Sequence, residues 1–577
     1  MTPAPSSAAR PPILVCVAWP YANAPLHLGH MAGCYLPADI FARFQRLRGR
    51  DVLMVSGSDE HGTPITVSAE KEGVSPAAIA ERYHRINTQA LTDFDIQFDL
   101  FTRTTTENHR QVVHDVFRRL QAGGYIEPRT MQVLYCPRCE RFLPDRFVEG
   151  TCPHCGYARA RGDQCENCGR TLDPQDLIDP RCRISGDTPI FRESVHLFFR
   201  LSAFAAPLTA WLADKDYWRP TVLAFTRSWI QQGLLDRAIT RDLSWGVPVP
   251  RPGFEEKRIY VWFEAVIGYL SASVEWAARQ DQPAAWERFW KHPEARHYYF
   301  LGKDNVPFHT IIWPSMLLGM GGLNLAYDVP ANEFLQIDGA KFSKSAGLGV
   351  WVSDVLGRFE VDAIRYYLSV NMPETRDASW SWEELVQRVN DELVGTFGNF
   401  CHRTLTFTRK HFGAIPPLGE LTDLDRAALA RIAETGDELA RALDACEFRR
   451  GLRAFMSLAQ AGNQYFDARA PWALVKTDRP ACGSVLHVCL KMISALASTR
   501  RRSSRAPPPG YGDTWAGTAR ARRPGIRRRR SFPLAELCPS PRFSSPSSTS
   551  KPFSPDPSAE RSGVAPGPVG LLGASIG

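Results

Sequence analysis

The stretch that decides the fold runs from Ile13 to Met31 and reads ILVCVAWPYANAPLHLGHM. Its opening run, Ile13–Val17, is apolar and rich in β-branched residues, which predicts a buried strand. A loop punctuated by Pro20 and Pro25 follows, and a helical pattern starts at Met31. A buried strand, a loop and a helix start are the first half of a βα unit of the kind that binds nucleotides.

The tetrad His27-Leu28-Gly29-His30 stands where this loop meets the helix. A helix N-terminus presents unpaired N–H groups and a positive dipole potential, and both suit a phosphate. Gly29 has no Cβ, so a ligand can approach its backbone closely. The two histidines can donate hydrogen bonds to phosphoryl oxygens. Taken alone, the tetrad is as compatible with a surface loop as with a phosphate site.

The segment from residue 13 to residue 130 alternates between strand and helix patterns. We predict strands at Ile13–Ala18 and Val52–Ser56, and helices at Met31–Gly49, Thr66–Glu72, Pro76–Phe94 and Glu107–Ala122. This alternation predicts an α/β fold with a doubly wound parallel, Rossmann-like sheet. Ligands of such sheets lie at the carboxyl ends of the strands. Asp59 follows the second strand and is expected there, with a helix N-cap as its alternative role.

Cysteines interrupt the alternation between residues 131 and 185. Three Cys-x-x-Cys pairs occur there, Cys136/Cys139, Cys152/Cys155 and Cys165/Cys168, together with a single Cys182. Each pair sets two thiolates on one tight turn, and two adjacent pairs complete a tetrahedral zinc site. We therefore predict one structural zinc, held by Cys152, Cys155, Cys165 and Cys168. Four cysteines leave no open coordination position for catalysis.

The sheet pattern resumes near residue 220. Alternation from Arg258 to Phe263 predicts a strand that opens into an aromatic-rich segment, for which core packing is the alternative. Further strands are predicted at Tyr299–Leu301, followed by Asp304, and at Glu333–Ile337. The last leads into Lys341-Phe342-Ser343-Lys344-Ser345. Lysines among serines and glycines indicate a mobile basic loop that can close over a triphosphate.

From Val386 onward the sequence shows apolar residues at helical spacing, which predicts a helix bundle. After about Ala497 arginine, proline, serine and glycine dominate, which predicts disorder. The break is abrupt within a helical pattern, so we hypothesise that the tail is translated out of frame. If the tail is genuine, its arginines could bind RNA without sequence specificity.

Composition and charge narrow the function classes only slightly. The net charge is +8, but residues 500–530 hold eleven arginines and one aspartate and so contribute +10, which leaves −2 for the rest. The basic balance is therefore no evidence for nucleic-acid binding by the body of the chain. We see no apolar run of membrane length and no secretory signal in MTPAPSSAARPP, and expect a cytoplasmic protein.

The paired HLGH and KFSKS segments, in this order, resemble the signatures of class I aminoacyl-tRNA synthetases. Further segments resemble the methionyl-tRNA synthetase family within that class: WPYANAPLHLGH, GSDEHGTPI, YVWFEAVIGY, LGKDNVPFH and NDELVGTFGNFCHRTLTF. The resemblance covers roughly residues 13–496 and is specific, because five independent segments agree in order.

The resemblance implies roles for individual residues. The catalytic and ATP-binding positions would be His27, Gly29, His30, Asp304, Lys341 and Lys344. The methionine-binding positions would be Trp19, Tyr21, Asp59, Trp262, Ala265, Tyr269 and His309, although Val266 and Asn305 depart from the common pattern. Asn399, Arg403 and Trp472 match positions that read the anticodon. Cys136, Cys139 and Cys182 match a second metal-binding set whose fourth ligand falls at Ser185.

The resemblance also implies an activity: ATP and Mg²⁺ activate L-methionine to methionyl-adenylate, and the methionyl group passes to the 3′ end of tRNA(Met). A monomer is expected. Three alternatives stay open, namely a nucleotidyltransferase with a similar histidine motif, a class I synthetase for an aliphatic amino acid, and an inactive RNA-binding homologue. Methionine-dependent exchange between ATP and pyrophosphate would separate them.

The predicted domain order follows from these segments. It comprises a disordered lead (1–12), two halves of a catalytic domain (13–130 and 225–349) around a zinc-knuckle insertion (131–224), a connector (350–385), a helical anticodon-binding domain (386–498), and a disordered or out-of-frame tail (499–577).

Overall fold

A computed structural model describes residues 10–144, 147–162, 165, 167–168, 170, 172–337, 340–341 and 349–498. For Ala340, Lys341 and Ser498 only the backbone is described. The predicted tail, most of the predicted lead and Lys344 lie outside the described residues.

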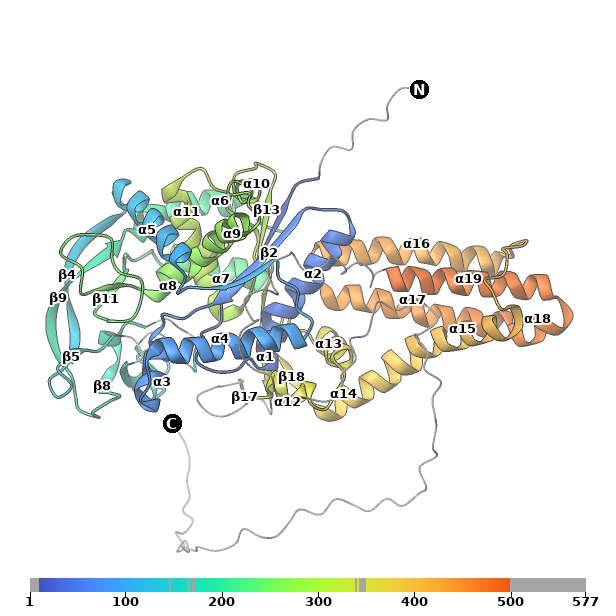
Figure 1. Cartoon of the computed structure of the whole chain (residues 1–577), viewed down its shortest axis with the longest axis horizontal. Coiled ribbons are helices and arrows are strands. Elements are labelled where there is room, and N and C mark those ends of the chain that lie inside the picture. Colours follow the sequence, from blue (N-terminus) through green and yellow to red (C-terminus); the bar gives the residue numbers. More distant parts are fainter. Residues whose placement is uncertain are drawn as a thin grey trace, which may run out of the picture. The chain divides into compact units, whose positions relative to one another are not determined.

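A parallel sheet forms the centre of the predicted catalytic domain (Figure 1). Its strands run in the order β14-β13-β1-β2-β3, with bounds β1 (Ile13–Val17), β2 (Val52–Ser58), β3 (Leu100–Arg103), β13 (Arg296–Gly302) and β14 (Ala326–Asp328). A short strand, β15 (Ala331–Asn332), pairs in parallel with the end of β13. Because the order runs outward in both directions from β1, the switch point of this doubly wound sheet lies beside β1. The predicted parallel sheet is confirmed.

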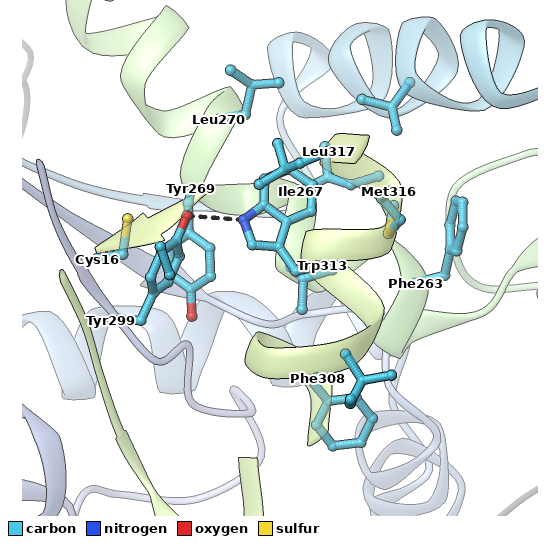
Figure 2. Packing of buried hydrophobic residues seen from close by; sticks show 14 of the residues in the cluster. Cys16, Phe263, Ile267, Tyr269, Leu270, Tyr299, Phe308, Trp313, Met316 and Leu317 are labelled. Atoms are coloured by element: carbon cyan, nitrogen blue, oxygen red, sulfur yellow. Dashed lines mark hydrogen bonds between the residues drawn. The ribbon is translucent and has the colours of Figure 1, made fainter. Parts of the chain in front are cut away.

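Alternate residues of β1 pack into two different cores, as a strand buried on both faces requires. Leu14 and Cys16 join one core, with α5 (Glu107–Ala122), α9 (Gly268–Arg279) and α11 (Trp313–Met320). Figure 2 shows this core, where the indole of Trp313 donates a hydrogen bond of 2.9 Å to the hydroxyl of Tyr299. The other face packs on the helix that follows the HLGH tetrad.

That helix is continuous but not uniform. It consists of α1 (Leu28–His30), a π-helical turn η1 (Met31–Tyr35) and α2 (Leu36–Leu47). The helix therefore starts three residues before the predicted start at Met31. One further prediction is wrong. The segment from Arg258 to Phe263 is not one strand, because β12 ends at Ile259 and α8 (Val261–Glu264) turns the chain into a helix. Bulky aromatics at Tyr260, Trp262 and Phe263 gave a strand pattern that tertiary packing overrides.

The cysteine-containing insertion has its own sheets. β4 (Ile126–Cys136) and β9 (Ile190–Phe199) form a long antiparallel pair, flanked by β5 (Arg141–Phe142) and β10 (Arg237–Ala238). A smaller sheet has the order β7-β6-β8, with β6 (Val148–Thr151), β7 (Ala160–Arg161) and β8 (Ile178–Cys182). The cysteines lie in and between these strands.

Shorter elements connect the sheets. They are α3 (Thr63–Glu72), α4 (Pro76–Asp93), α6 (Ala205–Trp211), α7 (Pro220–Gln231), α10 (Glu287–Trp290), α12 (Val352–Leu356), α13 (Val361–Val370), β11 (Thr240–Arg241) and β12 (Arg258–Ile259). A three-stranded sheet, β17-β16-β18, joins β16 (Leu335–Ile337) and β17 (Ala340–Lys341) to β18 (Ala378–Trp380).

The predicted helix bundle is confirmed. It is built from α14 (Trp382–Arg388), the π-helix η9 (Val389–Gly398), α15 (Asn399–Phe412), α16 (Asp423–Asp444), α17 (Phe448–Arg469), α18 (Pro471–Thr477) and α19 (Arg479–Ser498). Helix α19 is long and apolar enough, by length and composition, to cross a membrane, contrary to our reading of the sequence. Yet 56% of its apolar window is buried, and Val485, Leu486 and Met492 are fully buried, as in a core helix.

Candidate functional site

The carboxyl ends of the central strands place the predicted site residues together. Trp19 and Tyr21 follow β1, Asp59 follows β2, and Asp304 follows β13. The backbone fixes these loops to one another: Ala22 N–H donates to the Asp59 carbonyl at 2.9 Å, and Asp59 N–H donates to the Pro20 carbonyl at 2.9 Å. The sheet thus holds the Trp19 and Asp59 loops rigidly at the switch point, where ligands of doubly wound sheets bind.

Asp59 is a buried carboxylate that lacks a full set of partners. It is 4% exposed, and among the described residues its Oδ1 has no hydrogen-bond partner. Burial, followed by the charge of nearby Glu264, raises the pKa of Asp59 well above its ordinary value. A carboxylate in this setting is stabilised when a cation enters beside it. Asp59 is therefore suited chemically to a cationic partner.

Two glycines make room for the indole of Trp19. A Cβ on Gly57 would lie 2.6 Å from this ring, and a Cβ on Gly268 would lie 2.7 Å from it. The ring also meets Tyr269 edge to face, with 6.4 Å between ring centroids. Trp19 Nε1 is buried and has no hydrogen-bond partner among the described residues. The indole is thus clamped in one orientation.

Trp19 and two hydrogen-bonded pairs of side chains form a surface that we call the aromatic wall. Trp262 Nε1 donates to the Tyr21 hydroxyl at 2.5 Å, and the Tyr269 hydroxyl lies 2.7 Å from His309 Nε2. His309 Nδ1 lies 2.8 Å from the Asn305 carbonyl and must donate to it, so Nε2 accepts from Tyr269. Burial lowers the pKa of His309 to about 4, which keeps the ring neutral. Neutral aromatic surfaces of this kind suit an apolar, polarizable thioether.

Trp262 and Ala265 are partly exposed, while Phe263, Glu264 and Val266 beside them are buried. Their exposed faces lie at the start of α8 and just after it. Part of the Trp262 side chain is thus accessible where the buried chain turns.

The HLGH tetrad is tied to the chain just after the lysine-containing segment. Leu28 N–H donates to the Val350 carbonyl at 3.0 Å, and Val352 N–H donates to the Leu26 carbonyl at 3.2 Å. His27 forms an antiparallel bridge with Trp351. At the start of that segment, Lys341 in β17 pairs through its backbone with Gln336 in β16. Lys344 lies outside the described residues.

The two histidines of the tetrad are close together. Their ring centroids are 3.7 Å apart, and His27 N–H donates to His30 Nδ1 at 3.1 Å. His27 is 8% exposed, and Gly29 and His30 are partly exposed. Asp304, in the turn after β13, accepts from Asn305 Nδ2 at 3.2 Å. A Cβ on Gly302 would lie 2.9 Å from Asp304 Oδ1, so glycine makes this carboxylate placement feasible.

The four cysteines predicted to bind zinc come together. Their Sγ atoms all lie within 4.8 Å of one another. Cys152 Sγ is 3.9 Å from Cys168 Sγ, and Cys155 Sγ is 3.6 Å from Cys165 Sγ. Tetrahedral Zn–S bonds of about 2.3 Å imply sulfur–sulfur distances of about 3.8 Å. These residues fit a zinc ion.

A second cluster gathers Cys136, Cys139 and Cys182, whose Sγ atoms also lie within 4.8 Å of one another. Ser185 Oγ lies 3.3 Å from Cys136 Sγ. The fourth position is thus a hydroxyl, which is a poorer zinc ligand than a thiolate.

The predicted anticodon residues lie together on the bundle, apart from the sheet edge. Asn399 and Arg403 are on α15, and Trp472 is on α18. Arg403 pairs with Asp467 at 2.5 Å and lies 4.7 Å over the ring of Phe466. The Phe466 ring centroid is 6.1 Å from that of Trp472, which is 46% exposed. An exposed tryptophan beside an arginine suits stacking of unpaired bases.

Sequence reasoning missed three residues beneath the Asp59 loop. Glu264 is fully buried and lies 2.9 Å from His61 Nδ1 and 2.5 Å from His109 Nε2. Burial alone would raise the pKa of Glu264, but the two histidines hold it at about 2. The segments GSDEHG and VWFEA contained a signal, because each places a titratable residue beside predicted ligand residues.

Two family profiles match the chain. One, described as tRNA synthetases class I (M), covers residues 13–405, and the other, the anticodon binding domain of methionyl tRNA ligase, covers residues 415–501. The chain belongs to the methionyl-tRNA synthetase family.

Relatives and solved structures agree with this membership. The chain is 53% identical over 493 residues to a methionine–tRNA ligase of Roseiflexus sp. (strain RS-1), covering 84% of this chain and 83% of that one. Identity to the ligase of Dehalococcoides mccartyi (strain ATCC BAA-2266 / KCTC 15142 / 195) is 53%, with 84% and 88% covered. The fold is similar to Mycobacterium tuberculosis methionyl-tRNA synthetase in complex with methionyl-adenylate, with TM-score 0.70, 30% identity, and 85% and 90% covered.

Proposed function

We propose that this chain joins L-methionine to the 3′ end of tRNA(Met), with ATP converted to AMP and diphosphate. The observation that carries the proposal is the pairing of Leu26 and Leu28 with Val350 and Val352. It anchors the chain that follows the lysines beside the HLGH tetrad, so that two distant basic segments can act on one triphosphate. The family membership supports the same reaction.

In the first step, the methionine carboxylate attacks the α-phosphorus of ATP, and diphosphate leaves. No protein nucleophile takes part; the side chains position the reactants and stabilise the charge on the transferring phosphoryl group. His27 and His30 donate to phosphate oxygens beside the backbone of Gly29, and Lys341 and Lys344 neutralise the phosphates from the other side. Mg²⁺ accompanies ATP and offsets part of its charge.

Asp304 binds the ribose hydroxyls of ATP, because a carboxylate at the end of β13 faces the same edge as the tetrad. Methionine occupies the neighbouring aromatic wall. Its ammonium group pairs with Asp59, and its thioether packs between Trp19, Tyr21, Trp262, Ala265, Tyr269 and His309. Within the described part of the chain Asp59 Oδ1 has no hydrogen-bond partner, and this supports the assignment, because an ammonium would supply the missing donor.

In the second step, a ribose hydroxyl of the terminal adenosine of tRNA attacks the carbonyl of the adenylate, and AMP leaves. Asn399, Arg403 and Trp472 read the anticodon by stacking and by hydrogen bonds to base edges. Each domain then has its own role. Methionine is activated by residues 13–130 and 225–349, and the acceptor end of tRNA is guided by residues 131–224. A connector, 350–385, leads to residues 386–498, which read the anticodon. We further propose that the chain acts as a monomer in the cytoplasm.

One zinc ion is held by Cys152, Cys155, Cys165 and Cys168, where it stiffens the knuckles of the insertion. Metal analysis of the purified chain tests this, with one zinc per chain expected. The variant Cys165→Ser is expected to lose that zinc, whereas Cys139→Ser is expected to keep it. Two zinc ions per chain would instead place metal at the three-cysteine cluster.

The decisive assay for the reaction is exchange of labelled pyrophosphate into ATP. We expect exchange with methionine and at least 100-fold less exchange with leucine or valine. A preformed pocket whose polar groups are placed for one side chain rejects side chains that cannot satisfy those groups. Exchange supported only by leucine or valine would refute the methionine specificity. No exchange with any amino acid would favour an inactive homologue.

A further inference from the structure

Beneath the methionine-binding side chains lies a buried carboxylate that the proposed mechanism does not use. Glu264 ends α8 and is 0% exposed. Its Oε1 accepts from His61 Nδ1 at 2.9 Å, and its Oε2 contacts His109 Nε2 at 2.5 Å. An ionised carboxylate is tolerated in the interior only when it is paired and hydrogen-bonded. Glu264 and the two histidines therefore form one unit, which we call the Glu264 network.

Hydrogen bonds on both ring nitrogens hold His109 in one orientation. Its Nδ1 lies 2.8 Å from the Ser271 hydroxyl, which is also 3.0 Å from the Gly268 carbonyl. Its Nε2 faces a carboxylate oxygen of Glu264 and donates to it. Glu264 thus accepts from two histidines, which is how an interior carboxylate is stabilised.

His61 links the network to the substrate site. Its ring donates to Glu264, and in the chain it stands two residues after Asp59. Its backbone N–H acts against the rise in the pKa of Asp59 that burial causes. The ring also packs edge to face on Trp245, with 5.5 Å between centroids. Glu264 therefore fixes the orientation of His61, and His61 in turn fixes the loop that carries Asp59.

We propose that Glu264 is a positioning residue for the ammonium end of methionine. Acting through His61, it holds the Asp59 carboxylate where a substrate ammonium can pair with it, while a hydrogen bond with His109 holds Glu264 itself in place. Because its side chain is fully buried, it acts through His61 and not through a contact of its own with a ligand. The inference rests on the proposed function, in which Asp59 binds that ammonium.

The test compares two ligands on the full-length protein. Methionine has the ammonium group, whereas 4-(methylthio)butanoic acid has the same carboxylate and thioether without it. In Glu264→Gln we expect the KM for methionine to rise about tenfold, because one well-aligned hydrogen bond to a charged group is lost. The KM for ATP and the inhibition constant of the desamino acid are expected to stay within about twofold.

A rescue pair tests the route through His61. His61→Ala removes the ring donor and is expected to raise the KM for methionine as Glu264→Gln does. His61→Asn keeps an amide N–H near the position of Nδ1 and is expected to restore at least half of the loss. This pair also serves if Glu264→Gln does not fold.

Glu275 supplies a matched control. It is a buried carboxylate on α9, 9% exposed, that accepts from Thr102 Oγ1 at 2.7 Å and pairs with Arg279 at 2.5 Å. Glu275→Gln removes a comparable charge outside the network, and its KM for methionine is expected to match the wild type.

The outcomes separate the inference from the function beneath it. Equal weakening of methionine and the desamino acid, or no change in either, would overturn the positioning role. Failure of His61→Asn to restore binding would overturn the route through His61. If the wild-type chain itself shows no methionine-dependent exchange, it is the proposed function that fails.

Discussion

The carboxyl edge of the sheet and the α15–α18 end of the bundle offer their side chains to ligands in opposite ways. At the sheet edge, Asp59 is 4% exposed, and Trp19, in the loop after β1, is held against Gly57, Gly268 and the ring of Tyr269 in α9. On the bundle, Trp472 is 46% exposed. A small ligand can be enclosed, so its site can be built from buried, preorganised groups. Unpaired bases arrive on a large molecule, so the groups that read them must stand at the surface.

Two activity assays test this comparison. Methionine activation, measured by pyrophosphate exchange, needs only the sheet edge, whereas tRNA charging, measured by aminoacylation, needs both regions. Asp59→Asn has the largest expected effect. Loss of a buried partner for the substrate ammonium is expected to lower kcat/KM for methionine about 100-fold or more in pyrophosphate exchange. Asp328→Asn, a change at a buried carboxylate at the end of β14, is the control. A loss below tenfold would contradict the assignment of Asp59.

Trp472→Ala is expected to have the next largest effect, and on charging alone. Loss of one stacked base is expected to lower kcat/KM for tRNA about tenfold in aminoacylation. Exchange activity should equal that of the wild type, because α18 contributes nothing to the sheet edge. Phe225→Ala, an exposed aromatic on α7, is the control. If Trp472→Ala lowers exchange as strongly as charging, the two regions are not independent.

The stability of Asp59→Asn sharpens the contrast between the regions. The Asp59 pKa is raised above its ordinary value of 3.8, so its ionisation costs stability once the pH exceeds that of the unfolded carboxyl. At pH 7 we expect Asp59→Asn to be about 1–2 kcal/mol more stable than the wild type. Below pH 3.8 both states are protonated, and the gain should vanish. Urea unfolding at pH 7 and near pH 3 measures the difference; an equal gain at both would refute the charge argument.

Asp467→Asn is expected to have the smallest effect. Asp467 pairs with Arg403, and their side chains are 56% and 31% exposed. Such a pair contributes at most about 1 kcal/mol, so thermal unfolding should be almost unchanged. Because the ion pair contributes so little free energy, its removal should change kcat/KM for tRNA in aminoacylation by no more than about threefold. A larger loss in aminoacylation would mean that Asp467 itself contacts tRNA.

Local pattern was sufficient for much of the chain. The buried strand at Ile13–Val17, the helices from Pro76 and Glu107, and the bundle after Val386 were predictable because apolar spacing reports directly on burial. The paired cysteines gave the four-thiol cluster, because each Cys-x-x-Cys pair is itself a local turn. Family resemblance, and not spacing, supplied most of the predicted substrate residues.

Other features depended on residues far apart in the sequence. The turn of the chain into a helix at Val261 and the gathering of Cys136, Cys139 and Cys182 beside Ser185 follow from long-range packing. So does the Glu264 network, whose members come from three separate segments. The sequence by itself determined which segments are buried, because burial leaves a periodic apolar pattern. Only the tertiary structure decided which buried charges meet, because the partners of a carboxylate are set by the packing of distant helices and leave no periodic trace.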